Sequence, residues 1–196
     1  MFSLIAGYYR LWFEPQESVI LVVGLNHAGK TTALEHIKCV FGGLEPLPAG
    51  KIPPTVGLNI GRVQIRRQKL VFWDVSGASS LRSLWDRYFG ETHAIIYVVD
   101  ASDRARLDES RDVLRGLLSN DELQDAPLLV LANKQDMPGA LSPDELESRF
   151  ELQSMLTVGQ HVSVHGATAT NGSGLQEGVL WLADVLKNLA RAGSPP

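Results

Sequence analysis

The stretch Gly24-Leu-Asn-His-Ala-Gly-Lys-Thr31 decides the fold of this chain. It has the spacing G-x-x-x-x-G-K-[ST], and it follows an apolar run at 19–23 and precedes a helical pattern over 30–40. A strand, a glycine-containing loop and a helix in this order are typical of a phosphate-binding loop, whose backbone N–H groups and helix N-terminus face phosphate oxygens. We therefore expect Lys30 to reach the β- and γ-phosphates of a nucleotide and the Thr31 hydroxyl to bind Mg²⁺.

Strand-like and helix-like segments alternate along the rest of the chain. Two of the predicted strands are continuous apolar runs, as expected for strands that are covered on both faces. The predicted strands cover 56–65, 69–74, 94–99 and 127–132, with a basic turn at 66–68, and the predicted helices cover 103–118, a segment that begins at Ser142, and 175–190. This alternation indicates one α/β domain with a mostly parallel sheet.

Composition limits the classes of protein that fit. A chain of 196 residues with 44% hydrophobic and 20% charged residues is long enough for one globular domain. The net charge of −4 lacks the basic excess of a nucleic-acid binder. The single cysteine, Cys39, cannot form an internal disulfide, so we expect a reducing compartment and a small buried side chain on a helix. No apolar run approaches the roughly 20 residues that span a bilayer.

A second motif, Asn133-Lys-Gln-Asp136, follows the apolar strand at 127–132. The Asp136 carboxylate can accept two hydrogen bonds from the N1–H and N2–H₂ donors of guanine, and adenine lacks this donor pair. Lys134 can lay its alkyl stem along the base. A phosphate-binding loop alone is compatible with kinases, ATPases and GTPases, and this tetrapeptide favours a guanine nucleotide.

Three further segments complete the predicted site. Asp74 ends a strand and begins the pattern Asp-x-x-Gly, so that its carboxylate can hold Mg²⁺ through water and Gly77 can meet the γ-phosphate. Thr55 lies in a loop that can bring its hydroxyl to Mg²⁺ when the γ-phosphate is present. In Thr168-Ala-Thr170, the Ala169 N–H can donate to guanine O6.

These motifs resemble the Arf and Arf-like family of small GTPases over about residues 1–190. The resemblance is carried by Gly24-Leu-x-x-Ala-Gly-Lys-Thr-Thr32, Pro54-Thr-Val-Gly-Leu-Asn59, Phe72-Trp-Asp74, Ser83-Leu-Trp85 and Leu131-Ala-Asn-Lys-Gln-Asp136. The start Met1-Phe2, the phrase Thr55-Val-Gly-Leu-Asn-Ile-Gly61 and a longer segment before Thr55 are most similar to the Arf-related subgroup.

The resemblance implies a P-loop GTPase domain at 18–192 with a six-stranded sheet and helices on both faces, an amphipathic helix at 1–14 and a flexible tail at 193–196. It implies GTP or GDP and Mg²⁺ as cofactors, with Lys30, Thr55 and Gly77 in catalysis and Thr31, Thr55 and, through water, Asp74 at the metal. The implied nucleotide-binding residues are Gly24, Leu25, Asn26, His27, Ala28, Gly29, Lys30, Thr31, Thr32, Thr55, Gly77, Asn133, Lys134, Asp136, Thr168 and Ala169.

The chain departs from the family pattern at Ala78, where the family has a Gln that orients the attacking water. A methyl group cannot hold this water, so we expect very slow hydrolysis. Ser76, Ser79 and His27 remain candidates to replace the Gln. Two interpretations stay open: a regulated GTP/GDP switch, or a GTP-bound scaffold that recruits effectors. Asn26 and His27 are also unusual in the phosphate loop and predict an altered nucleotide exchange rate.

The first thirteen residues carry an apolar face at helical spacing, formed by Phe2, Ile5, Tyr9 and Trp12 or Phe13. This face predicts reversible membrane association, or a helix packed on the domain. Residue 2 is Phe, which excludes N-myristoylation. The resemblance implies a monomer with an exchange factor and effectors as partners, at the cytoplasmic side of the Golgi.

The resemblance also implies that the hairpin 58–74 shifts its register when GTP binds. We expect an exposed hydrophobic effector patch at Phe72, Leu84 and Trp85, and we expect Trp73 in the core.

Overall fold

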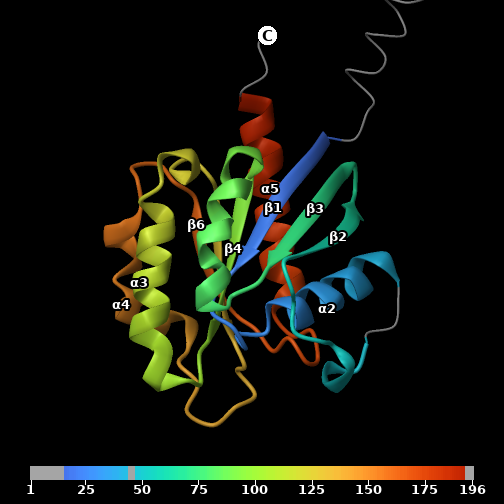
Figure 1. Cartoon of the computed structure of the whole chain (residues 1–196). Helices are drawn as coiled ribbons and strands as arrows, with labels where there is room; N and C mark the ends of the chain where they lie inside the picture. Colours follow the sequence, from blue (N-terminus) through green and yellow to red (C-terminus); the bar gives the residue numbers. More distant parts are fainter. Residues whose placement is uncertain (1–15, 44–46, 193–196) are drawn as a thin grey trace, which may run out of the picture.

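The computed structural model describes residues 16–43 and 47–192 of the chain. A six-stranded sheet lies at the centre, with strand order β2-β3-β1-β4-β5-β6 (Figure 1). The strands are β1 (Gln16–Val23), β2 (Leu58–Ile65), β3 (Gln68–Val75), β4 (Ala94–Asp100), β5 (Leu128–Asn133) and β6 (Val162–Gly166). The α-helices are α2 (Lys30–Gly42), α3 (Leu107–Leu118), α4 (Pro143–Phe150) and α5 (Leu175–Ala192). Short 3₁₀ helices are η1 (Ala49–Lys51), η2 (Ser79–Glu91), η3 (Arg104–Arg106), η4 (Asp121–Leu123) and η5 (Leu152–Met155).

The sheet is parallel except for β2, which forms an antiparallel hairpin with β3 at one edge. The hairpin register places Leu58 opposite Val75 and Ile65 opposite Gln68. Since β1 lies between β3 and β4, the loop after β1 opens at the same sheet edge as the ends of β3, β4 and β5. Ligands of open α/β sheets bind at this carboxyl edge.

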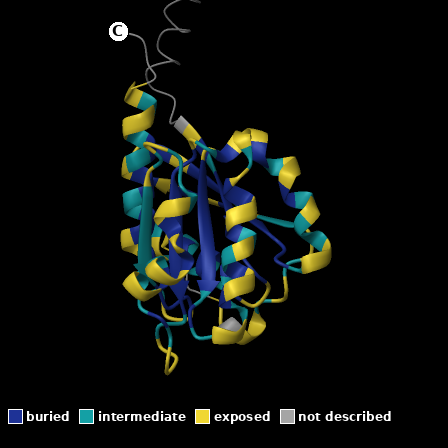
Figure 2. Cartoon of the chain, turned by 90° about the vertical axis from the view of Figure 1, so that its left-hand side faces the viewer, coloured by how far each residue is buried: buried dark blue, intermediate teal, exposed yellow. Residues whose placement is uncertain are grey.

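Helices cover both faces of the sheet, and each face has its own hydrophobic core (Figure 2). Alternate residues of β1 point to opposite sides: Ile20 and Val22 contact the side covered by α2 and α5, and Leu21 and Val23 contact the side covered by η2, α3 and α4. All four of these side chains are buried. The predicted α/β class and mostly parallel six-stranded sheet are therefore confirmed.

The element boundaries differ modestly from the sequence predictions. The expected helix at 103–118 begins as the 3₁₀ turn η3, and α3 starts only at Leu107. Gln68, expected in the basic turn, is the first residue of β3, and its side chain donates to the Ala183 carbonyl oxygen of α5 at 3.1 Å. The cap expected at Ser142 is present as a full capping box with Glu145. The helical segment η2 was not predicted.

The expected hydrophobic effector patch is wrong for two of its three members. Phe72 is fully buried in the core beside α2 and α5, and Trp85 of η2 is buried in the core on the other face of the sheet. Trp73 is half-buried and packs edge-to-face on Tyr88 with ring centroids 5.6 Å apart, so it does contribute to the core as expected. Because adjacent strand residues point to opposite faces, Phe72 packs against α2 and α5 and Trp73 packs against η2. Cys39 is half-buried on α2.

The N-terminal segment 1–14 and the tail 193–196, including the predicted membrane-facing residues Phe2, Ile5 and Tyr9, lie outside the described residues. In the part of the chain that the structure describes, no helix combines the length and apolar character needed to cross a membrane.

Candidate functional site

The loop between β1 and α2 has the geometry of a phosphate cradle. Gly29 precedes the first helical residue with φ of 95°, and a Cβ there would lie 2.3 Å from Asn133 Nδ2, so only glycine fits. Lys30 is buried, and its Nζ donates to the carbonyl oxygens of Gly24 at 3.1 Å and Leu25 at 2.9 Å. The ammonium group therefore lies against the loop that it is expected to help close around phosphate.

Burial lowers the pKa of Lys30 to about 8; the Asp74 carboxylate opposes this shift, and the positive charge of Arg82 adds to it. A desolvated ammonium group gains from a nearby anion, because the anion replaces the solvation that burial removed. The site is thus electrostatically suited to a phosphate group.

Three oxygen-bearing side chains meet beside Lys30. The Thr31 hydroxyl lies 2.6 Å from the Thr55 hydroxyl and donates to Asp74 Oδ2 at 2.7 Å, and the Thr55 hydroxyl is 3.3 Å from the same oxygen. These residues come from α2, the loop before β2, and β3. The structure thus brings together the three residues that the sequence predicted for Mg²⁺.

The cluster fits Mg²⁺ by its chemistry. All its donors are hard oxygens, and Asp74 Oδ1 is buried without a hydrogen-bond partner among the described residues. Burial raises the pKa of Asp74, against hydrogen bonding from Thr31 and the charge of Lys30. Over residues 16–43 and 47–192 no three His, Cys, Asp or Glu side chains form a metal-binding group, so an ion here would take its other ligands from phosphate and water.

Gly77 closes the phosphate end of the site. A Cβ at Gly77 would lie 2.3 Å from the Gly24 carbonyl oxygen and 2.6 Å from the Asn26 nitrogen, so the segment after β3 lies directly on the phosphate loop. A cavity of about 490 Å³ opens here. Its lining includes Asn26, His27, Gly29, Lys30, Thr31, Thr32, Pro54, Thr55, Ser76, Gly77 and Ala78.

The end of β5 connects the phosphate loop to the loop after β6. Asn133 is buried; its Nδ2 donates to the Ala28 carbonyl oxygen at 2.7 Å, and its Oδ1 accepts from the Ala169 N–H at 2.9 Å. Ala169 and the neighbouring Thr168 are also buried. The two loops expected to contact the phosphates and the base are therefore held together by one amide side chain.

Lys134 and Asp136 lie beside this connection. Lys134 adopts a positive φ of 65° and its Nζ bonds Asp100 Oδ2 at 2.6 Å. Burial by itself raises the pKa of Asp100, but hydrogen bonds from Lys134 and Ser102 outweigh it and hold the pKa below its ordinary value. Asp136 is exposed, so its carboxylate is accessible to a ligand.

Asn26 and His27 occupy the exposed tip of the phosphate loop. His27 has a positive φ of 63°, which is uncommon for a residue with a Cβ. Arg106 Nη1 donates to the backbone oxygen of Asn26 at 3.1 Å and to its Oδ1 at 3.2 Å, while its Nε bonds Asp103 Oδ2 at 2.6 Å. Arg106 therefore tethers the loop tip to η3.

These features define a P-loop nucleotide-binding protein. The model of the ADP-ribosylation factor family matches residues 5–186, and this chain belongs to that family. Members of the family are GTP hydrolases that bind GTP or GDP with Mg²⁺.

Individual relatives agree with this assignment. The chain is 38% identical to ADP-ribosylation factor-related protein 1 of Rattus norvegicus, over 97% of this chain and 96% of that protein. It is 35% identical to ADP-ribosylation factor-like protein 3 of Saccharomyces cerevisiae, over 100% of this chain and 98% of that protein. It also resembles the Arl6 BBS3 small GTPase of Trypanosoma brucei, solved with the nucleotide analogue GppNp, with a TM-score of 0.76 and 28% identity over 88% of this chain and 99% of that one.

Sequence reasoning missed three residues of the site region. Asp100, the partner of Lys134, ends a parallel strand at the same edge as Asn133, and that position was a usable signal. Arg106 and Arg82 gave no comparable signal, because each connects a nearby residue to one that is 80 or 27 positions away in sequence.

Proposed function

We propose that this protein is a GTP/GDP switch of membrane trafficking whose hydrolysis is very slow. The observation that carries the proposal is Ala78, which lies at the wall of the phosphate cavity directly after Gly77. The family has a Gln at this position, and the methyl group of Ala78 has neither a donor nor an acceptor to orient water. Even with its Gln, Ras without an activating protein hydrolyses GTP at only about 10⁻⁴ s⁻¹.

The site residues keep the roles expected from the sequence. Lys30 contacts the β- and γ-phosphates, the hydroxyls of Thr31 and Thr55 ligate Mg²⁺, and Asp74 holds the ion through water. Gly77 donates its N–H to the γ-phosphate. The approach of Thr31, Thr55 and Asp74 to within 2.6–3.3 Å of one another supports this arrangement.

The base is guanine, bound by the side chains of Asn133, Lys134 and Asp136 and by the loop at Thr168 and Ala169. The exposure of Asp136 and the bond between Asn133 and the Ala169 N–H support a preformed base site. Donation from Ala169 to guanine O6 requires this N–H to share or exchange its bond to Asn133.

A GTP-bound scaffold that recruits effectors is the second candidate, and Ala78 is also the observation that favours it. If hydrolysis is absent on the timescale of nucleotide exchange, the protein stays in its GTP form and acts only by binding. The γ-phosphate sensors Thr55 and Gly77 are retained in both cases.

The cellular setting follows from the family resemblance. We place the protein on the cytoplasmic side of the Golgi as a monomer, with an exchange factor and effector proteins as partners. Reversible membrane association through residues 1–13 provides one weak anchor, so a second signal or an effector completes the attachment.

Single-turnover hydrolysis of Mg²⁺-bound GTP tests the catalytic proposal. The wild type is compared with Ala78→Gln and with Ser80→Gln, which places the same side chain two residues further along at an exposed position. We expect a wild-type rate at or below about 10⁻⁴ s⁻¹ and a faster Ala78→Gln variant, with Ser80→Gln unchanged. An ordinary small-GTPase rate in the wild type contradicts the proposal, because another residue must then position the water.

Exchange measured on the same protein separates the two candidates. A GTP-loaded wild type that converts to GDP faster than it releases GTP is a switch. A wild type that releases GTP unhydrolysed is a scaffold.

A further inference from the structure

Two carbonyl oxygens of the segment after β3 are each held by a side chain of η2. Trp85 Nε1 donates to the Ser76 oxygen at 2.9 Å, and Arg82 Nε donates to the Gly77 oxygen at 3.1 Å. In a planar trans peptide the C=O and the following N–H point in opposite directions. Holding the Ser76 oxygen on Trp85 therefore turns the Gly77 N–H away from η2, and the Gly77 backbone lies against the phosphate loop.

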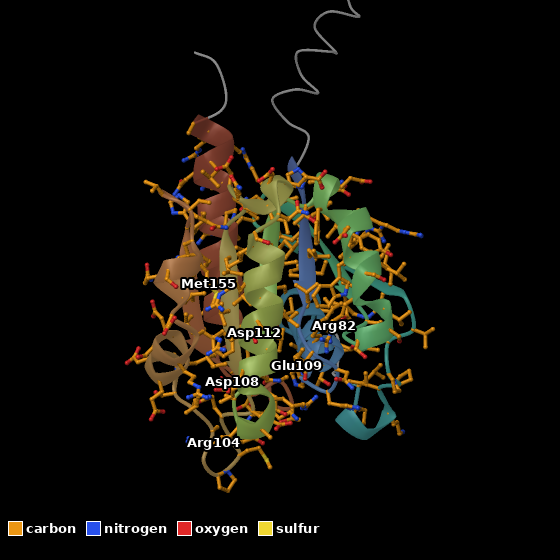
Figure 3. All side chains as sticks on the ribbon, turned by 60° about the vertical axis from the view of Figure 1, so that its left-hand side comes forward. Arg82, Arg104, Asp108, Glu109, Asp112 and Met155 are labelled. Carbon is orange, nitrogen blue, oxygen red and sulfur yellow. The ribbon has the colours of Figure 1, made fainter. Side chains whose placement is uncertain are left out.

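Arg82 also forms an ion pair with a residue of α3. Its Nη2 bonds Glu109 Oε1 at 2.7 Å, and the two side chains meet between η2 and α3 (Figure 3). Only 18% of the Arg82 side chain is exposed, compared with 45% for Glu109. A partly covered, charge-assisted bond of this kind is stronger than a fully exposed surface pair.

Glu109 lies on a helix that is hydrogen-bonded to the sheet. It lies in the first turn of α3, next to Ser110, whose backbone oxygen accepts a hydrogen bond from Tyr97 of β4 at 2.8 Å. Tyr97 is fully buried in the sheet. The chain of contacts from β4 through α3 and Glu109 to Arg82 thus fixes the Gly77 carbonyl relative to the sheet.

We propose that Arg82, clamped by Glu109, is a positioning residue that holds the Gly77–Ala78 peptide, while Trp85 holds the preceding Ser76–Gly77 peptide that carries the Gly77 N–H. By fixing the second peptide, Arg82 keeps the Gly77 segment in its γ-phosphate-binding orientation and so sets the preference for GTP over GDP. The proposal rests on the proposed function, in which Gly77 contacts the γ-phosphate. The clamp reduces the conformational entropy that the segment loses on binding GTP, whereas GDP has no γ-phosphate and gains nothing from it.

The position of Ala78 makes this clamp more important in this chain. Without a Gln side chain, the segment has fewer groups that can face the γ-phosphate, so the orientation of its backbone matters more. The Ala78 N–H lies 3.4 Å from Ser76 Oγ, so the Ser76 side chain adds a local contact within the same turn. Backbone orientation then depends on the two η2 side chains.

Competition binding of fluorescent GDP against GDP and GppNp, with Mg²⁺ and the full chain, tests the proposal. We expect Arg82→Ala to weaken GppNp about tenfold, as for the loss of one charge-assisted hydrogen bond, and to leave GDP within about twofold. Glu109→Gln should shift the ratio of the two affinities in the same direction by a smaller factor. Arg82→Lys should restore only part of the ratio, because an ammonium group lacks the fork that spans both partners.

Arg87→Ala is the matched control, since Arg87 is an exposed arginine of the same η2 segment and should leave both affinities unchanged. Equal weakening of GDP and GppNp by Arg82→Ala, or no change in either, overturns the clamp. A wild type that fails to bind guanine nucleotides overturns the proposed function instead, so the two failures are distinct. Thermal unfolding of the GDP forms confirms that each variant is folded.

Discussion

Replacing Asn133 by Ala is expected to loosen the nucleotide site and destabilise the domain together. The substitution leaves the Ala28 carbonyl oxygen and the Ala169 N–H without their shared partner, which bonds them at 2.7 and 2.9 Å. Asn133 is only 2% exposed, so water has little access to either group. At about 1–3 kcal/mol for each unpaired buried group, the free energy of unfolding should fall by about 2–6 kcal/mol.

Urea unfolding in saturating Mg²⁺-GDP measures this loss, and the release rate of fluorescent GDP measures the effect on the site. We expect GDP to be released at least about tenfold faster. A decrease of about 1.4 kcal/mol in the stability of the GDP complex is enough for this change. Repeating the unfolding at several GDP concentrations separates weaker binding from lower intrinsic stability.

Two further variants make this prediction specific. Asn133→Asp keeps the acceptor for the Ala169 N–H but places an oxygen against the Ala28 oxygen, so it should also be destabilised. Asn171→Ala removes an exposed turn contact to the Ser173 N–H and should cost much less. A change below about 0.5 kcal/mol in Asn133→Ala, with unchanged GDP release, would refute the reasoning that this side chain joins the two loops.

Two other predictions concern stability. Ser142→Ala removes the hydroxyl that accepts from the Glu145 N–H at 3.3 Å and should lower the free energy of unfolding by about 0.5–2 kcal/mol in urea; no loss would mean that α4 does not depend on its cap. Burial lowers the pKa of His165 below 6.5, and the charge of Glu177 opposes this shift. As the pH falls, His165 is therefore protonated in the unfolded chain before it is protonated in the folded one. Stability should therefore fall as the pH drops below 6.5, and His165→Gln should flatten this part of the profile; an unchanged profile would contradict the assignment.

The phosphate loop and the base motif could be predicted from the sequence because each is a short contiguous segment. Within Gly24–Thr31 the glycines, Lys30 and Thr31 are fixed in spacing by local backbone geometry, and the flanking apolar run and helix complete the signal. The same holds for the tetrapeptide that ends in Asp136, which follows a strand with an unambiguous apolar pattern. The parallel sheet then follows from the alternation of strands and helices.

The segment η2 was not predicted, although the sequence carries a signal for it. Its apolar residues recur at helical spacing: Leu81, Leu84, Trp85, Tyr88 and Phe89. What the sequence could not tell is which of the adjacent aromatics Phe72 and Trp73 is fully covered. The packing of α2 and α5 on one face, and of Tyr88 on the other, decides it.

By itself the sequence determined the fold class, and it predicted the phosphate and base motifs and the absence of a water-orienting Gln at Ala78, because these depend on residue types at short, fixed spacing. Only the tertiary structure decided that Asn133 joins two loops and that Arg82 connects Gly77 to Glu109 on α3. Asn133 and its two partners, and Arg82 and Glu109, are far apart in the chain, and these contacts depend on how the helices pack on the sheet. The local preferences of the chain do not determine which distant residues meet, so the packing of the helices on the sheet decides these contacts.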